Sequence, residues 1–272
     1  MSDIVISLRD VTKRYGMSKV LKGVNLDIEK GEIYGLIGKN GSGKTTIFKT
    51  ILGLSEFQGG TLFVGDEGDT LKQGRAKIGF FIGTHFFPYM TAKQNLKYYC
   101  KLKGVKGARA EINRVLEIVG LKDVKSKFKA YSLGMKQRLG VAAAMLGNPE
   151  IIILDEPTNG LDPQGIADVR NVLKKLNEEY GTTIVISSHI LGELQNTAHR
   201  FAILNDGVIA NVFSQEDLSV ESEYEYIKLK SSDIQMAKEV LEHVGIEIQG
   251  EKKETVSLED YYFNVVGGQE NE

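Results

Sequence analysis

Four residues near the N-terminus have the types and the spacing of a phosphate-binding loop. Gly38, Gly43, Lys44 and Thr45 match the pattern G-x-x-x-x-G-K-[ST]. The glycines let the backbone turn tightly, so that successive N–H groups converge on an anion beside a helix N-terminus. Lys44 would reach the β- and γ-phosphates of a nucleotide, and the Thr45 hydroxyl would ligate Mg²⁺. The expected contacts with the phosphates comprise Gly38, Lys39, Asn40, Gly41, Ser42, Gly43, Lys44, Thr45 and Thr46.

The segments on either side of this loop provide the context that the motif requires. An apolar run at 33–37 predicts a buried strand that leads into the loop, and residues 46–52 predict the start of a helix. At ordinary residue usage the motif alone would arise by chance in roughly one chain of this length in a hundred. The strand and the helix together make a chance glycine-rich turn a poor explanation.

A pair of carboxylates follows a second apolar run. Asp155 and Glu156 come directly after the residues Ile-Ile-Ile-Leu at 151–154, and a continuous apolar run favours a parallel strand buried on both faces. In phosphate-loop proteins an acid in this place holds Mg²⁺, so Thr45 and Asp155 are the expected metal ligands. Glu156 could orient or deprotonate an attacking water. As an isolated pair, Asp-Glu is a common surface dipeptide, and its position after the strand favours the functional interpretation.

The remaining pattern predicts an α/β fold that opens with β structure and carries a helical insert. Residues 84–150 form this insert, which accounts for the 111 residues between Lys44 and Asp155. Its helices should include one with Ile112, Val115 and Leu116 at core spacing. Strands are expected at 4–8, 24–28, 61–64, 77–82, 182–186 and 224–229, helices at 91–103, 108–119, 132–146, 163–179 and 233–243, and a hairpin at Asp206-Gly207.

Composition limits the function classes that are plausible. The chain has 272 residues and a net charge of −2, which argues against a nucleic-acid binder. Residues 93–138 carry a net charge of +10 and residues 215–272 a net charge of −10. Both stretches could be solvated helix faces, or the basic one could face anionic lipid or an acidic partner.

Cysteine usage and hydropathy indicate where the chain works. The single cysteine, Cys100, excludes an intramolecular disulfide and fits a reducing cytoplasm. No run approaches 18 apolar residues, and the N-terminus lacks the pattern of a signal peptide. A role at a membrane is therefore expected to require a separate protein.

Three further segments follow the phosphate loop in a fixed order and make the interpretation specific. They are YSLGMKQRLG at 131–140, LDEPTNGLDP at 154–163 and SSH at 187–189. Together they resemble the ATP-binding subunits of ABC transporters, and the resemblance covers roughly residues 2–215. The segments YSLGMKQRLGVAAA and FFPYMTAKQNL resemble the bacitracin- and lantibiotic-resistance branch of that family.

The resemblance implies an ATPase domain at 1–215, with a RecA-like core, an N-terminal antiparallel β subdomain and the helical subdomain at 84–150. Residues 216–272 would form a small C-terminal α/β accessory segment. Glu156, His189 and Lys44 would be catalytic, with His189 touching the γ-phosphate, and Tyr15 would stack on adenine. The signature motif, which contacts the ATP held by the opposite subunit, would comprise Ser132, Leu133, Gly134, Met135 and Lys136. Leu161 and Asp162 would form the loop that crosses the dimer.

The partners implied by the resemblance are a second copy of the chain and a membrane-spanning transporter subunit, with no nucleic acid. Two copies would hold two ATP molecules and Mg²⁺ head to tail, on the inner face of the cell membrane. ATP hydrolysis by this subunit would power export of, or resistance to, antimicrobial peptides. One position departs from the family pattern: Gly83 stands where the family carries a glutamine, followed by Thr84 and His85. We expect His85 to be a surface loop residue rather than a replacement ligand.

Two other functions fit parts of the pattern. A chromosome-maintenance or repair ATPase shares the signature motif, but such proteins need long coiled-coil heptads, which this sequence lacks. A small-molecule kinase would use the phosphate loop, but it would have no use for the signature motif at 131–140.

Overall fold

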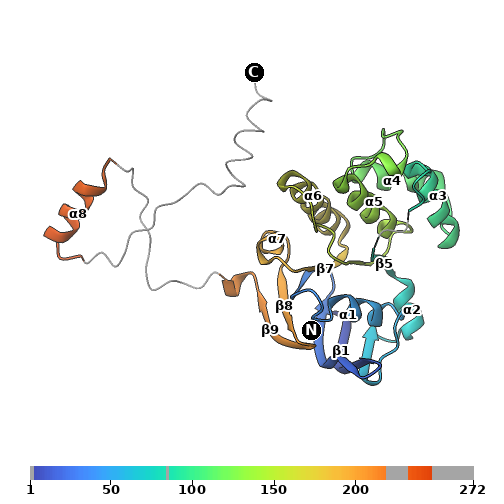
Figure 1. Ribbon diagram of the computed structural model, residues 1–272, viewed down its shortest axis with the longest axis horizontal. Coiled ribbons are helices and arrows are strands. Elements are labelled where there is room, and N and C mark those ends of the chain that lie inside the picture. The colour runs from blue at the N-terminus through green and yellow to red at the C-terminus, as the bar shows by residue number, and fades with distance from the viewer. Residues whose placement is uncertain (1–2, 84–85, 219–231, 247–272) are drawn as a thin grey trace. The chain divides into compact units, whose positions relative to one another are not determined.

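The structure is a computed structural model that describes residues 3–83, 86–218 and 232–246 (Figure 1). The chain divides into two compact units, Met1–Ser219 and Val220–Glu272. In the second unit the described residues form the helix α8, Ile234–His243, as predicted for 233–243. The strand predicted at 224–229 lies outside the described residues.

The first unit opens with an antiparallel sheet in the order β2-β1-β4. Strand β1 is Ile4–Tyr15, β2 is Ser18–Glu29 and β4 is Gly59–Val64. Strands β1 and β2 are longer than predicted because residues 9–15 and 18–23 contain few apolar side chains and do not alternate regularly, and one of the polar side chains, Lys13, is itself buried. Irregularities in the register between the two strands interrupt the alternation further, which hides the strand in the sequence.

A second sheet forms the centre of this unit, and within the described residues its order is β5-β6-β7-β3-β8-β9. Neighbours from β5 to β8 run parallel, and β9 pairs antiparallel with β8 through the hairpin predicted at Asp206-Gly207. The bounds are Ile33–Ile37 for β3, Ile78–Phe81 for β5, Ile151–Leu154 for β6, Thr183–Ser188 for β7, Arg200–Asn205 for β8 and Val208–Ser214 for β9. The parallel strands therefore bring the carboxyl ends of β3, β6 and β7 to one edge of the sheet, where ligands bind in such folds.

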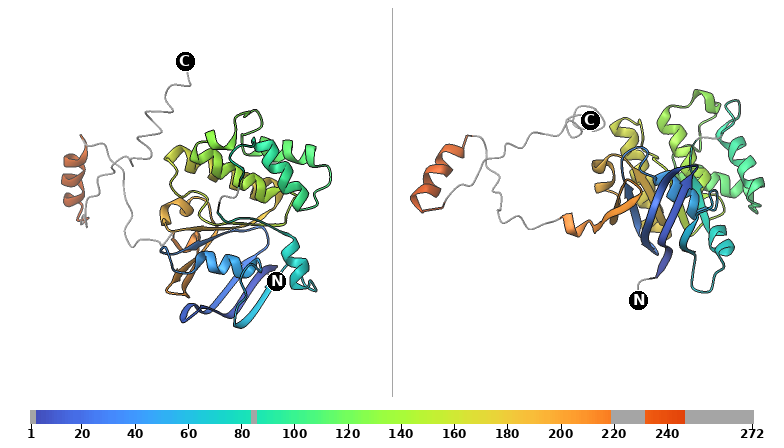
Figure 2. Two further views of the ribbon diagram at one scale, coloured as in Figure 1. Left: turned by 45° about the vertical axis from the view of Figure 1, so that its right-hand side comes forward. Right: turned by 60° about the horizontal axis from the view of Figure 1, so that its bottom comes forward.

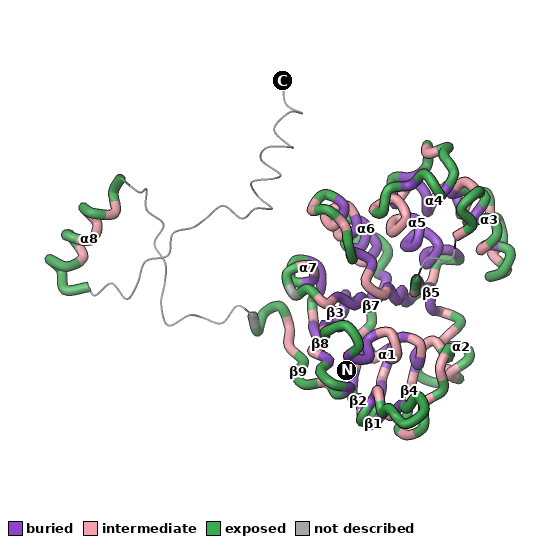
Figure 3. The backbone as a smooth tube through the Cα atoms, in the orientation of Figure 1, coloured by how far each residue is buried: buried purple, intermediate pink, exposed green. Residues whose placement is uncertain are grey.

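Both faces of this central sheet are covered, which explains the uninterrupted apolar runs of β3 and β6 (Figure 3). Helix α1, Lys44–Ile51, packs with its buried Ile47, Phe48 and Ile51 between this sheet and the antiparallel sheet. Helices of the insert and α6, Pro163–Tyr180, cover the opposite face (Figures 1 and 2). The strand and the helix on either side of the phosphate loop are thereby both packed into the core.

The helical insert has the elements that the sequence predicts. Its helices are α3, Ala92–Leu102, α4, Ala108–Ile118, and α5, Leu133–Met145, with a short 3₁₀ turn η1, Phe128–Ala130. Thr91 and Gln94 form the capping box of α3, and Ile112, Val115 and Leu116 are buried as expected. The sequence did not predict α2, Leu71–Ala76, α7, Leu191–Gln195, or the 3₁₀ turn η2, Glu216–Leu218, because elements this short show no periodicity.

Within the described residues, none of the helices combines the length and the apolar character that crossing a bilayer requires.

Candidate functional site

The phosphate loop joins the end of β3 to the start of α1. A Cβ atom on Gly38 would lie 2.5 Å from the Leu204 carbonyl oxygen and 2.6 Å from Ser42 Oγ, so a larger residue would push the loop out of place. Gly41 and Gly43 have φ of 82° and 113°, a region that other residues rarely adopt. Gly43 caps α1, and Lys44 is its first residue. The glycines therefore aim the first N–H groups of α1 into the loop.

The phosphate loop fixes the side chain of Lys44. Its Nζ donates to the carbonyl oxygens of Gly38, at 2.6 Å, and Lys39, at 3.3 Å. The same Nζ lies 3.1 Å from Glu156 Oε1, and only 4% of the Lys44 side chain is exposed. A buried ammonium group with these partners is oriented toward the space in front of the loop.

Asp155 connects two strand ends to the phosphate loop. The Thr45 hydroxyl donates to Asp155 Oδ2 at 2.6 Å, and the Ser187 hydroxyl donates to Asp155 Oδ1 at 2.7 Å. These contacts form because β6 and β7 are parallel neighbours, with Leu154 opposite Ile186, so the residues that follow them lie side by side. The carboxylate is consequently fixed from both sides.

Glu156 adopts an unusual backbone conformation. Its φ is 47°, a left-handed value that costs a residue with a side chain about 1–2 kcal/mol. The Glu156 backbone N–H donates to Ser187 Oγ at 2.9 Å, which helps to hold this conformation. On the far side of the carboxylate from Lys44, His189 Nδ1 lies 3.2 Å from Oε2, although the angles are not those of a hydrogen bond. The turn thus points the carboxylate between a lysine and a histidine.

The structure brings together five of the residues predicted from separate motifs. Lys44, Thr45, Asp155, Glu156 and His189 meet at the carboxyl ends of β3, β6 and β7. Among the described residues no cluster of three or more His, Cys, Asp or Glu side chains could hold a metal by itself. The oxygens of Thr45 and Asp155 fit Mg²⁺, which prefers oxygen ligands and keeps several waters or phosphate oxygens as well.

Tyr15 comes from the other sheet, at the end of β1. Its side chain is 49% exposed, its hydroxyl forms a hydrogen bond of 3.1 Å with Ser55 Oγ, and Lys13 Nζ lies 4.8 Å from the ring centroid. An exposed aromatic ring with a nearby cation is suited to stacking on a base.

The signature segment lies at the N-terminus of α5. Ser132 Oγ accepts a hydrogen bond from Met135 N at 3.2 Å and so caps the helix. Leu133 is 46% exposed, and Lys136 Nζ lies 5.7 Å from the centroid of the Phe128 ring. In the ranges that the structure describes, no hydrogen bond or ion pair joins residues 132–136 to the cluster around Lys44 and Asp155.

The predicted dimer loop adjoins the signature segment. Asp162 Oδ1 accepts a hydrogen bond from Gly165 N at 2.9 Å and caps α6, and Leu161 packs against the buried core. A Cβ atom on Gly134 would lie 3.8 Å from Leu161 Cδ2. The N-termini of α5 and α6 therefore lie close together.

Gly83, the position that departs from the family pattern, follows β5 with φ of 71°. A glutamine would be strained in this conformation. The glycine therefore removes a side chain from this position and also allows the backbone conformation of the loop. Thr84 and His85, the alternatives at this position, lie outside the described residues.

Sequence reasoning overlooked two polar residues beside the site. Ser187 is fully buried and bridges Asp155 and Glu156, although only the histidine of the SSH segment was expected to matter. Glu193, on the unpredicted α7, accepts hydrogen bonds from Thr158 and Ser188. The available sign was that Ser187 follows the predicted apolar strand 182–186 as Asp155 follows the apolar run 151–154.

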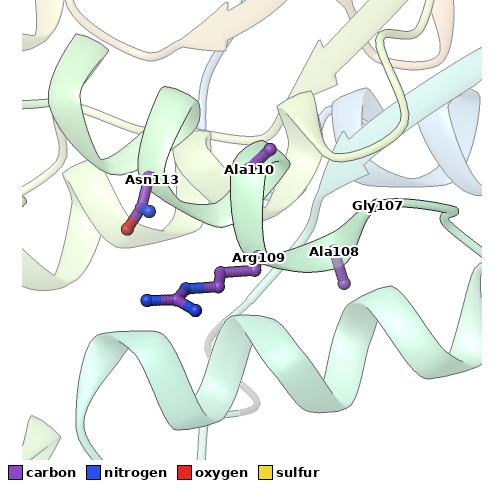
Figure 4. Close-up of a pocket in the computed structure, with 5 residues that line it drawn as sticks. All are labelled: Gly107, Ala108, Arg109, Ala110 and Asn113. Carbon is purple, nitrogen blue, oxygen red and sulfur yellow. The ribbon is translucent and has the colours of Figure 1, made fainter.

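A hollow beside the start of α4 is unrelated to this cluster. It is lined by Gly107, Ala108, Arg109, Ala110 and Asn113 (Figure 4). The lining contains one charged side chain and no acid, so it offers no chemistry of its own.

Comparison with known proteins identifies the family. A family model described as ABC transporter matches residues 21–159. The bacitracin transport ATP-binding protein BcrA of Enterococcus faecalis is 41% identical, over 88% of this chain and 79% of the relative. The lantibiotic transport ATP-binding protein SrtF of Streptococcus pyogenes is 39% identical, over 75% of this chain and 89% of the relative. A dimeric post-hydrolysis state of the ATP-binding cassette MJ0796, bound to ADP and Pi, has a TM-score of 0.68 and 30% identity, over 78% of this chain and 99% of that chain.

The chain therefore belongs to the ATP-binding proteins of ABC transporters, as its motifs predict. It is the ATP-binding subunit of such a transporter and hydrolyses ATP to ADP and phosphate. A second solved structure of MJ0796, a bacterial ABC transporter cassette, is also dimeric, with a TM-score of 0.68 and 31% identity over 78% of this chain and 99% of that chain.

Proposed function

We propose that this subunit powers export of, or resistance to, antimicrobial peptides through a separate membrane-spanning partner on the inner face of the cell membrane. The relatives named for bacitracin and lantibiotic transport support the substrate class. Another relative is named for linearmycin resistance. Sequencing the neighbouring genes for a six-helix membrane protein would test the assignment of the partner.

The observation that carries the chemical part of the proposal is the position of the Glu156 carboxylate between Lys44 and His189, at 3.1 and 3.2 Å. In our proposal Lys44 and the loop N–H groups stabilise the charge of the transferring phosphoryl group. Glu156 orients the attacking water and accepts its proton. His189, whose ring lies beside Glu156, contacts the γ-phosphate.

Thr45 and Asp155 would hold Mg²⁺, which would neutralise phosphate charge when bound. The hydrogen bond between these two side chains supports the proposal because it brings both oxygens to one place. Tyr15 would stack on adenine, and the phosphate-loop residues 38–46 would bind the phosphates.

We further propose a head-to-tail dimer in which each ATP is bound by the phosphate loop of one copy and the signature residues 132–136 of the other. The closeness of Gly134 to Leu161, described above, supports this arrangement because it places the dimer loop beside the signature segment. The dimeric relative bound to ADP and Pi supports it as well. The ATPase domain would comprise residues 1–215, with 84–150 as its helical subdomain and 216–272 as an accessory segment.

The rival functions receive less support. The longest helix in the described ranges is α6, with 18 residues, which is too short for the coiled coils of chromosome-maintenance ATPases. A small-molecule kinase would not need a signature segment beside a dimer loop. The proposal assigns no nucleic-acid partner.

The test of the proposed chemistry is the variant Glu156→Gln. We expect it to bind ATP normally and to lower kcat by about 10²–10⁴-fold, because it removes the proton acceptor. Glu178→Gln, which changes an exposed glutamate on α6, serves as the matched control. If Glu156→Gln hydrolyses ATP as fast as this control, the assignment of Glu156 is wrong.

A further inference from the structure

Glu193, on α7, links two loops of the site through one carboxylate oxygen. Its Oε2 accepts a hydrogen bond from the Thr158 hydroxyl at 2.7 Å and another from the Ser188 hydroxyl at 2.9 Å. Thr158 is 5% exposed and Ser188 is 1% exposed. Hydrogen bonds between buried hydroxyls and a carboxylate are among the stronger ones in proteins, so this junction is well defined.

The two hydroxyls belong to different functional segments. Thr158 lies in the turn that leads from Glu156 to the dimer loop, and its carbonyl oxygen accepts a hydrogen bond from Leu161 N at 3.1 Å. Ser188 directly precedes His189, and its Oγ also accepts a hydrogen bond from Ile190 N at 3.0 Å. Each segment is therefore ordered internally, and Glu193 joins them.

Helix α7 provides Glu193 with a fixed support. Leu194 is 1% exposed, and Ala198, which follows the helix, is fully buried. A Cβ atom on Gly35, in the middle of β3, would lie 3.1 Å from Leu194 Cδ1 and 3.3 Å from Ala198 Cβ. The glycine thus lets this segment pack directly on the strand that carries the phosphate loop.

We infer that Glu193 is a positioning residue for ATP hydrolysis, which holds the dimer loop and the His189 loop in one geometry relative to the phosphate loop. It acts through Thr158 and Ser188 rather than on ATP. The inference rests on the proposed roles of Glu156 and His189.

The test compares Glu193→Ala with Glu193→Gln in the full chain. Removing the carboxylate should lower kcat about tenfold, the usual cost of losing an outer support of a site, while affinity for a fluorescent ATP analogue stays within twofold. Glu193→Gln should retain most of kcat, because its amide oxygen can accept both hydrogen bonds. Gln195→Ala, at an exposed position of the same helix, is the matched control and should behave as wild type.

A double-mutant cycle tests whether Glu193 acts through His189. If it does, Glu193→Ala/His189→Ala should be no slower than His189→Ala alone. Full additivity of the two losses would overturn the inference, as would a wild-type kcat for Glu193→Ala. Should Glu193→Ala fail to fold, Thr158→Val and Ser188→Ala each remove one of the two hydroxyls, and wild-type kcat in both would overturn the inference equally.

A failure of the positioning role of Glu193 can be distinguished from a failure of the proposed function. If Lys44→Ala or Glu156→Gln retained full turnover, the proposed chemistry itself would be wrong. If those two variants lose turnover as expected and the Glu193 series does not, only the positioning role fails.

Discussion

Replacement of Ser187 by alanine should separate stability from catalysis at this site. Ser187 donates to Asp155 at 2.7 Å and accepts from the Glu156 backbone N–H at 2.9 Å. Because the serine is fully buried, water has no ready access to replace either contact. Ser187→Ala therefore removes two supports from adjacent acidic residues with a single oxygen atom.

The expected loss of stability follows from these contacts. A hydrogen bond to a charged group contributes about 1.5–3 kcal/mol, and a buried N–H without a partner costs about 1–3 kcal/mol. Allowing for partial relaxation, we expect a loss of about 2–4 kcal/mol, or roughly 5–15 °C in Tm for a domain of this size. The kcat should fall about tenfold to a hundredfold, because the strained turn at Glu156 is released and its carboxylate moves.

Thr183→Val is the matched control for this variant. Thr183 is buried at the start of the same strand, β7, and its hydroxyl accepts a hydrogen bond from Gly31 N at 2.9 Å. Its loss should also lower Tm, but kcat at saturating ATP should remain that of wild type, because the contact lies at the opposite end of the strand. Tm would be measured by thermal unfolding, and kcat by phosphate release well below the Tm of both variants.

Two results would refute the reasoning about Ser187. The first is a wild-type kcat for Ser187→Ala in protein that is fully folded. The second is an equal fall in kcat for Thr183→Val, which would attribute the loss to general destabilisation of β7.

Further predictions concern the metal and the dimer. Gly83→Gln should lower the Mg²⁺ concentration for half-maximal ATPase activity and cost about 1–2 kcal/mol of stability, since φ is 71° there. An unchanged Mg²⁺ titration for Gly83→Gln, with a strong loss confined to His85→Ala, would contradict the proposed ligands. Glu156→Gln should elute as a dimer in size-exclusion chromatography with ATP and as a monomer without it. A monomer in both conditions would contradict the ATP-dependent dimer.

The parts of the site that could be predicted are those encoded by consecutive residues. The phosphate loop, its strand and its helix follow one another between 33 and 52, and Asp155 and Glu156 directly follow a buried strand. Each of these segments has a local physical requirement, such as glycine at φ of 113° or apolar residues on both faces of a strand. The sequence displays such requirements directly.

The parts that could not be predicted depend on pairing between distant segments. Ser187 reaches Asp155 only because β7 lies beside β6, and nothing within SSH specifies that neighbour. Glu193 reaches Thr158 through a five-residue helix that is too short to show periodicity. Strand β1 was predicted to end at Leu8 because its later residues alternate irregularly. The prediction therefore placed Tyr15 after the strand, whereas Tyr15 is its last residue.

Mixing two inactive variants tests the shared site most directly. Lys44→Ala disables one phosphate loop, and Ser132→Arg disables one signature segment. In a head-to-tail dimer of one copy of each, one composite site has both motifs intact and the other carries both defects. The proposal predicts that the mixture regains ATPase activity above that of either variant alone, up to about a quarter of wild type if pairing is random and one site can turn over. Activity of the mixture equal to the average of the two variants would contradict a site shared between copies.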